Sequence, residues 1–294
     1  MPSVSEPESV AEAAEALRSA GASAERVSIR ADGTSVDGAA VLSTARLNRI
    51  LEHEPGDLTA IVEAGLRLSE LRAALEPHGQ MLALDPPGDP TLGACLAADL
   101  SGPRRHRYGA MRDLVIGVTV VLADGTIASS GGKVVKNVAG YDLGKLFSGS
   151  RGRLGLVARL ALRLHPRPAA SATVVVETDD LRGAWQEIHR SQLTPSAVDV
   201  LPPDRIALLF EGSEAAVTRQ VETSRGVRHR DTAVWGESAA RQGDRRPVRF
   251  AWQPCLVGRP GIGLAWVDGR QPEPPWPLLA ERVRAAFDPE GILV

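Results

Sequence analysis

Apolar residues recur at regular intervals along the first 168 residues and predict a mixture of helices and strands. The apolar positions from Val10 to Leu17 lie at helical spacing and predict a helix over residues 7–19. A second, amphipathic helix is predicted over residues 67–79, where a glycine ends it. Within residues 114–130, alternating apolar residues flank Asp124-Gly125 on both sides. This pair predicts a hairpin with a type I′ turn. An apolar run from residue 154 predicts one long strand, closed by prolines.

The pattern changes after Pro168. Residues 172–223 predict a strand, a helix, two strands and a helix, an order typical of a ferredoxin-like α+β module. Residues 226–250 are polar and basic, and they predict irregular structure. We therefore expect a first domain over 1–168, a cap domain over 169–276, and a terminal helix within 277–294 that packs back on the first domain.

Charge and hydropathy exclude several classes of function. The formal net charge is −2 with both signs interspersed, so no surface suited to a nucleic-acid backbone is expected. The N-terminus lacks the basic and apolar regions of a signal peptide, and no run of about 18 apolar residues predicts a membrane span. The two cysteines, Cys95 and Cys255, are expected to be buried thiols, with a disulfide between them as the alternative. These features predict a cytoplasmic protein without its own iron–sulfur centre.

Glycine is concentrated in three loops beside apolar segments, at residues 30–38, 85–102 and 131–155. Because glycine adopts positive φ without strain, such loops can turn successive N–H groups toward one anion. Lysines at 133, 136 and 145 favour a phosphate-bearing ligand. Neither the P-loop nor the G-x-G-x-x-G pattern is present. Glycines that merely form turns are the alternative, but three such loops favour a nucleotide-type cofactor.

Two stretches resemble a known family. They are PTLGACLAADLSGPRRHRYG at 90–109 and GGKVVKNVAGYDLGKLFSGS at 131–150. Both are closely similar to the vanillyl-alcohol-oxidase (PCMH-type) flavoproteins and, among them, to FAD-binding subunits of bacterial glycolate oxidases. The resemblance covers residues 27–168 and resumes at AAFDPEGIL near the C-terminus. It implies an α+β fold, with a two-lobed PCMH-type FAD-binding domain followed by the small cap domain, and non-covalent FAD as cofactor.

The resemblance also implies which residues approach the cofactor. Residues 91–94 would wrap the flavin through their backbone N–H groups, and 155–156 would touch the adenine side. The implied set is Gly33, Thr34, Thr91, Leu92, Gly93, Ala94, Ser101, Gly102, Tyr108, Gly109, Lys136, Gly140, Tyr141, Asp142, Gly155 and Leu156.

The chain departs from the family pattern in its first loop and at three later positions. IRADGTS at 29–35 replaces a glycine-rich RPxGGGT, TLGA replaces TIGG, and Asp99 stands where the family has Asn. Arg153 replaces a threonine and could reach a phosphate instead. A charge-assisted hydrogen bond contributes about 1.5–3 kcal/mol, so losing two would weaken FAD binding roughly a hundredfold or more. A non-catalytic scaffold with a degenerate FAD site is therefore the main alternative.

Oxidation of a 2-hydroxy acid requires a base, a hydride acceptor and a cation for the carboxylate. Arg104, Arg105 and Arg107 are candidates for the cation, and His106 lies among them as a candidate base. Of these, Arg104 and His106 are the candidate catalytic residues, and a solvated basic turn is the alternative. No histidine has the spacing of a metal ligand, and no nucleophile elbow occurs, so neither a metal site nor hydrolase chemistry is expected.

The combined prediction is a FAD-binding oxidoreductase subunit of a glycolate-oxidase-like complex acting on a small 2-hydroxy acid. The resemblance implies two partners, a larger FAD-linked subunit and an iron–sulfur subunit. Contact with the inner face of the membrane would then run through these partners. A free-standing flavin oxidase for another hydroxy acid or alcohol is a further alternative.

Overall fold

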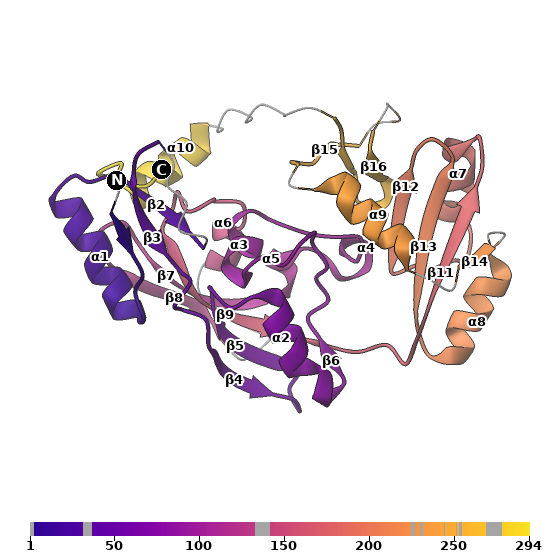
Figure 1. Ribbon diagram of the computed structural model, residues 1–294, viewed down its shortest axis with the longest axis horizontal. Helices are drawn as coiled ribbons and strands as arrows, with labels where there is room; N and C mark the ends of the chain where they lie inside the picture. Colours follow the sequence, from indigo (N-terminus) through magenta and orange to yellow (C-terminus); the bar gives the residue numbers. More distant parts are fainter. Residues whose placement is uncertain are drawn as a thin grey trace.

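The computed structural model describes residues 3–31, 37–132, 142–224, 227–229, 232–243, 245–250, 252, 255–268 and 278–294. A three-stranded, a five-stranded and a small two-stranded sheet with their helices form the N-terminal part, residues 3–168, and a seven-stranded sheet forms the second part, residues 170–268 (Figure 1). The segment around α4 (Arg105–Tyr108) lies between the two parts and contacts β12 and η2 of the second part.

The first lobe of the N-terminal part is a three-stranded parallel sheet covered by one helix. Its strand order is β1-β3-β2, with β1 at Val4–Ser5, β2 at Val27–Arg30 and β3 at Ala40–Ser43. Helix α1 (Val10–Ala22) begins after Ser9, whose Oγ accepts a hydrogen bond from the Glu12 N–H at 3.2 Å. The predicted helix is confirmed, and its apolar face is buried in the core of this lobe.

The second lobe is a five-stranded antiparallel sheet of order β4-β5-β9-β7-β8, with short helices on one face. The strands are β4 (Ile50–Glu54), β5 (Thr59–Glu63), β7 (Val115–Val121), β8 (Ile127–Gly131) and β9 (Leu156–Arg163). The helices are α2 (Leu68–Leu75), η1 (Glu76–His78), α3 (Leu92–Ala97), α5 (Met111–Leu114) and α6 (Leu143–Phe147), and β6 (Gln80–Met81) pairs with β10 (His165–Pro166). Apolar side chains of this lobe form the largest core cluster of the described residues.

The predicted hairpin is present as β7 and β8, but its turn differs from the prediction. Gly125 has a φ of +79°, whereas Asp124 is not among the residues with positive φ, as a type I′ turn would require. The Gly125 N–H and the Thr126 carbonyl both bond to Leu122, which is the pattern of a longer turn with a single left-handed glycine. The Asp124 carboxylate stabilises this turn by accepting the Thr126 N–H at 2.8 Å.

The second part is a seven-stranded antiparallel sheet of order β14-β11-β13-β12-β16-β17-β15. Its first five elements follow the predicted ferredoxin-like order: β11 (Ala170–Glu177), α7 (Leu181–Arg190), β12 (Ala197–Leu201), β13 (Arg205–Gly212) and α8 (Glu214–Thr223). Strand β14 (Val227–His229) follows, within the stretch that the sequence predicted to be irregular. The remaining elements are β15 (Val248–Arg249), β16 (Val257–Arg259), η2 (Pro260–Ile262) and β17 (Leu264–Trp266). Helices α7 and α8 pack on one face of this sheet.

A helix occupies part of the stretch that the sequence predicted to be irregular. Helix α9 (Ala233–Gln242) covers the other face of the seven-stranded sheet, against which Val234 packs. Its buried positions are Val234, Ser238 and Gln242, four residues apart. The prediction was wrong because two of these three are polar, so the hydrophobic pattern is missing although one face of the helix is buried.

The C-terminal segment returns to the first lobe. Val27 of β2 donates its N–H to the Ile292 carbonyl at 2.7 Å and accepts the Val294 N–H at 3.0 Å. Leu293 is fully buried in the first-lobe core, and Phe287 of α10 (Leu278–Phe287) packs against the core of the second lobe. Both cysteines are free thiols, and Cys95 is buried. None of the described helices is long and apolar enough to cross a membrane.

Candidate functional site

The start of α3 carries four of the residues implied for the cofactor. Thr91 is its N-cap, and the Thr91 Oγ1 accepts the Ala94 N–H at 3.3 Å. The Leu92 N–H donates to the Leu66 carbonyl at 2.9 Å, and the Gly93 N–H donates to the Ala64 carbonyl at 2.7 Å. These N–H groups are therefore already bonded within the protein, and a cofactor touching this segment would meet its other atoms.

Two glycines of the implied set are required by close backbone packing. A Cβ on Gly102 would lie 1.7 Å from the Asp85 carbonyl oxygen, and one on Gly93 would lie 2.8 Å from the Ala64 Cβ. Any side chain at either position would push neighbouring segments apart. Close contact between protein segments thus explains these glycines, and no approach of a cofactor is needed to explain them.

The remaining described positions divide between core and surface. Gly155 has a φ of +138°, and Leu156 is fully buried in the first-lobe core. The Asp142 side chain caps α6 by accepting the Lys145 N–H at 3.2 Å. Five implied residues lie outside the described part of the chain: Gly33, Thr34, Lys136, Gly140 and Tyr141.

The basic segment around α4 binds the second part of the molecule. Arg104 Nη2 lies 2.6 Å from Glu211 Oε1 on β13, and Arg104 Nε donates to the same oxygen at 3.2 Å. The Glu211 side chain is 1% exposed, whereas that of Arg104 is 30% exposed. Arg107 Nη1 donates to Ser196 Oγ and to the Glu211 carbonyl, both at 3.1 Å. A substrate carboxylate would have to displace Glu211 in order to bind Nε and Nη2 of Arg104.

The charge of Asp99 is compensated within the protein. Arg105 Nη1 lies 3.2 Å from Asp99 Oδ2, and Ser148 Oγ donates to Asp99 Oδ1 at 3.3 Å. Asp99 has a φ of +49°, a conformation that Asp and Asn adopt more readily than most residues. The acid at this family Asn position is therefore tolerated, because a neighbouring arginine pairs with it.

Asp85 links this segment to the buried charges of the second part. Both carboxylate oxygens of Asp85 accept the Arg104 N–H, at 3.1 and 3.2 Å. Loss of hydration on burial raises the pKa of Asp85 to about 6, although the positive charge and the N–H of Arg104 oppose this shift. A carboxyl group that loses its proton at a higher pH than an ordinary aspartate thus lies where the two parts meet.

Replacing Asp85 with Asn should change how stability depends on pH. The folded-state pKa of about 6 lies above the ordinary value of 3.8, so the contribution of Asp85 to stability is present below pH 4 and lost as the pH rises through 6. Between pH 4.5 and pH 7.5 this amounts to about 2 kcal/mol. Asp85→Asn should therefore stabilise the protein more, or destabilise it less, at pH 7.5 than at pH 4.5 by that amount.

The measurement is urea unfolding of both proteins at the two pH values. Asp89→Asn is the control: hydrogen bonds from Ser69 lower the pKa of Asp89, so its contribution to stability is lost only as the pH falls below 4 and should hardly change between the two pH values. Parallel pH profiles for wild type and Asp85→Asn would contradict the raised pKa.

His106 and Tyr108 fill the contact between the two parts. His106 lies so close to Gly261 of η2 that a Cβ there would be 2.5 Å from its Cε1. Burial lowers the pKa of His106, while the charge of Asp199 opposes the shift. The Tyr108 hydroxyl lies 3.5 Å from Glu211 Oε2, and its ring packs edge-on against that of His165. A neutral His106 can accept a proton, but its ring is packed against protein.

Gln242, at the end of α9, was not among the candidate residues. Gln242 Nε2 donates to the Ser101 carbonyl at 2.9 Å and so joins the second part to the implied cofactor segment. Among the described residues, neither Gln242 Oε1 nor the buried Ser150 Oγ has a hydrogen-bond partner. Ser150 is adjacent to the end of α3, because its neighbours Gly149 and Arg151 donate to the carbonyls of Leu96 and Ala97. Both atoms are enclosed by protein atoms, so they mark close packing between α9, α3 and the segment after α6.

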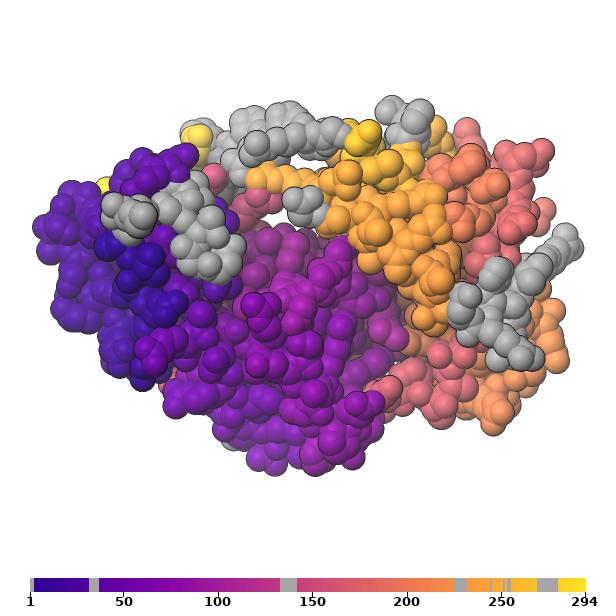
Figure 2. Space-filling view, in the orientation of Figure 1, coloured from indigo at the N-terminus to yellow at the C-terminus, as the bar shows by residue number. Residues whose placement is uncertain are grey.

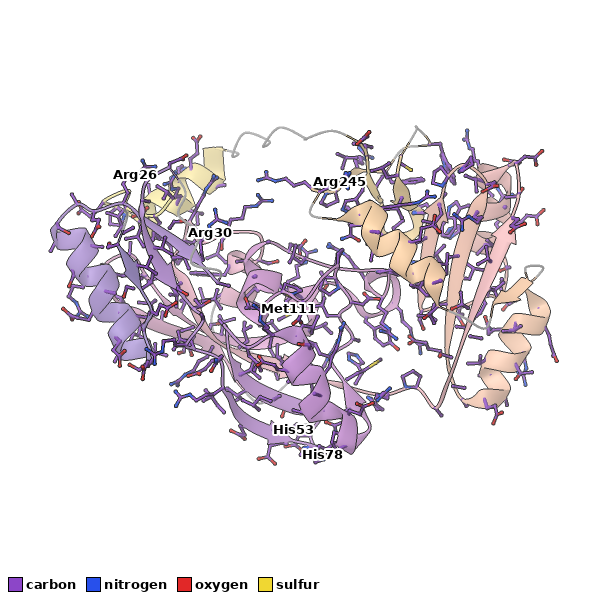
Figure 3. All side chains as sticks on the ribbon, viewed as in Figure 1. Arg26, Arg30, His53, His78, Met111 and Arg245 are labelled. Carbon is purple, nitrogen blue, oxygen red and sulfur yellow. The ribbon has the colours of Figure 1, made fainter. Side chains whose placement is uncertain are left out.

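The molecule is hollowed between its N-terminal part and the second part, beside the orange α9 region (Figure 2). In Figure 3, Arg30 at the end of β2 and Arg245 just after α9 lie on opposite sides of this opening. Arginines on both sides suit an anionic ligand.

Comparison with known proteins agrees with a FAD-binding fold. Residues 2–131 match a family model described as FAD binding domain. The glycolate oxidase subunit GlcE of Escherichia coli is 37% identical over 173 residues, which are 57% of this chain and 49% of that protein. The glycolate oxidase subunit GlcD of Bacillus subtilis is 36% identical over 170 residues, 56% of this chain and 36% of that protein. A mitochondrial D-lactate dehydrogenase of Saccharomyces cerevisiae is 33% identical, covering 55% of this chain and 28% of that protein.

The solved structures support the fold. Two structures of alkyldihydroxyacetonephosphate synthase align with TM-scores of 0.64 and 0.67 at 20% and 18% identity. They cover 75% and 80% of this chain, and 49% and 55% of those chains. The chain spans half the length, or less, of the three curated relatives named above. The predicted PCMH-type α+β fold, the resemblance to glycolate oxidase subunits, and FAD as the cofactor are confirmed.

Proposed function

We propose that this chain, whose residues 2–131 match a family model described as FAD binding domain, is a non-covalent FAD subunit of an enzyme that oxidises a small 2-hydroxy acid. The observation that carries this proposal is the similarity to a glycolate oxidase subunit over more than half of the chain. The scaffold alternative is not favoured, because the relatives named above are glycolate oxidase subunits and a D-lactate dehydrogenase, and the matching family model is described as a FAD binding domain.

The residues proposed to hold FAD are those implied by the family motifs. They are residues 33–34, the start of α3, the positions around Ser101 and Tyr108, residues 136 and 140–142, and residues 155–156. When bound, FAD supplies an acceptor for the two electrons of a hydride. The chain itself would exclude water through the contact of α4 with the second part.

The substrate-selecting residues are proposed to lie on a partner. Arg104 pairs with Glu211, and His106 packs against Gly261, so neither candidate catalytic residue is placed for a substrate within this chain. A larger FAD-linked subunit would then contribute the base and the carboxylate-binding cation, and an iron–sulfur subunit would carry electrons away. We propose a cytoplasmic location for this assembly.

The test compares the isolated chain with the complex that co-purifies with it. Each is mixed anaerobically with glycolate or D-lactate, and the visible flavin absorbance is followed. We expect the complex to bleach and the isolated chain to retain its colour. Bleaching of the isolated chain would indicate a free-standing oxidase. Absence of bleaching in both, with flavin present, would contradict a 2-hydroxy acid as substrate.

A further inference from the structure

The two parts of the molecule have separate apolar cores. The described residues form four clusters of buried apolar side chains: two in the N-terminal part, together with the C-terminal segment, and two in the second part. None of these four clusters contains side chains of both parts. Domains of one chain are expected to move relative to each other unless a large apolar interface joins them. The second part can therefore shift against the N-terminal part without opening either core.

Polar contacts on and beside α4 hold the two parts together. Arg104 Nη2 and Nε both bond to Glu211 Oε1, at 2.6 and 3.2 Å, and Arg107 Nη1 donates to the Glu211 carbonyl at 3.1 Å. Gln242 Nε2 adds one bond, to the Ser101 carbonyl. Hydrogen bonds within a protein can be exchanged for bonds to water, so the net cost of opening such a contact is modest. This polar contact can therefore open and close again.

The connection into the second part is short and anchored on both sides. The Arg167 N–H donates to the Gly79 carbonyl at 2.8 Å, and Arg167 Nη1 lies 2.6 Å from Glu76 Oε1, so Arg167 is fixed to the N-terminal part. Strand β11 of the seven-stranded sheet begins at Ala170. Only residues 168–169 lie between these two anchors. Hinge motions are absorbed at a few loop or element-terminal residues of this kind.

We propose that the second part is a hinged lid that turns about residues 168–169 and is held closed over α4 by the Arg104–Glu211 pair. The chain returns to α10 through residues 269–277, outside the described part, and a stretch of that length spans up to about 30 Å, enough to follow the turn. Opening would bring the Glu211 carboxylate and the Arg104 guanidinium into water and uncover α4. The lid requires no bound FAD, so this inference is independent of the proposed function.

The test measures a distance between the two parts of the intact chain. Spin labels are attached to Ala11→Cys on α1 and Ala240→Cys on α9, both exposed positions, and their separation is measured by pulsed EPR. The background is Cys255→Ser, because Cys255 is only half-buried and would also react, whereas Cys95 is buried. We expect one distance from this protein. With Arg104→Ala added, the closed form holds a buried carboxylate without its cation, so the ratio of open to closed molecules should rise roughly 30-fold and a second distance should appear.

Two further variants identify the cause. Arg205→Ala is the matched control: its side chain is 29% exposed, against 30% for Arg104, but its partner Glu237 lies within the second part, so the single distance should remain. Arg104→Ala/Glu211→Gln should lose most of the second distance, because an uncharged amide is tolerated in the closed form.

Circular dichroism of each labelled protein separates opening from unfolding. We expect Arg104→Ala to keep the far-ultraviolet spectrum of the parent while it shows the second distance. A single, unchanged distance in Arg104→Ala would overturn the lid, and so would the same second distance in Arg205→Ala. A second distance that appears only together with loss of the far-ultraviolet signal would also overturn it, because the pair would then maintain the fold and not a closed position.

Discussion

Replacing Arg259 with Met is expected to lower the free energy of unfolding by about 3–5 kcal/mol, because it leaves the carboxylate of a buried ion pair without its cation. Arg259 Nε lies 2.7 Å from Asp199 Oδ1, and Nη2 lies 3.3 Å from Asp199 Oδ2. The two side chains are 1% and 0% exposed, and the guanidinium lies 4.4 Å from the centre of the Trp266 ring. Without Arg259, the Asp199 carboxylate would keep only the bond from Ser238 that the structure shows.

Urea unfolding at pH 7.5 measures this effect. The double variant Asp199→Val/Arg259→Met should recover much of the loss, because no uncompensated charge then remains in the interior. Arg46→Met is the control: its pair with Glu8 is more than half exposed on both sides, so little change is expected. A loss for Arg259→Met as small as that of the control would contradict the buried network.

Replacing Arg104 with Ala is expected to cost about 2–4 kcal/mol, less than a fully buried pair because the arginine is partly exposed. The change leaves the buried Glu211 carboxylate without its main cation at the junction of the two parts. The two parts should then unfold in separate transitions, because this pair joins α4 to β13.

Scanning calorimetry of Arg104→Ala tests this expectation, and a second change identifies its cause. Glu211→Gln in the same background should restore part of the loss by removing the stranded charge. If Arg104 served only to bind a substrate carboxylate, Arg104→Ala would unfold as wild type does and would raise only the KM.

The sequence predicted the elements whose burial follows from apolar spacing. The helix at the N-terminus, the hairpin and the ferredoxin-like order are all present. The N-terminal helix and strand β7 of the hairpin each bury an apolar face, as their spacing predicted. The family motifs additionally identified FAD. Helix α9 was missed because its buried face is largely polar and so leaves no apolar stripe in the sequence. Ser238 and Gln242 are buried there and form hydrogen bonds to Asp199 and Ser101.

The candidate site also depends on contacts between residues that are far apart in the sequence, and the sequence did not predict them. Glycines at 93 and 102 suggested a cradle for an anion, whereas the structure explains them by close approach of two backbone segments. Arginines 104 and 107 suggested a carboxylate site, but their partners Glu211 and Ser196 are more than 80 residues away in the chain. Spacing along one sequence contains no signal for such contacts, because they arise only when the second part packs against α4.

The central claim is that this chain binds FAD, and the most direct measurement is the flavin content of the purified protein. The chain is denatured after its visible spectrum is recorded, and the released flavin is quantified against protein. The account predicts a yellow protein with close to one FAD per chain, or one that acquires this amount when FAD is added. A folded protein that stays colourless in excess FAD would contradict the claim.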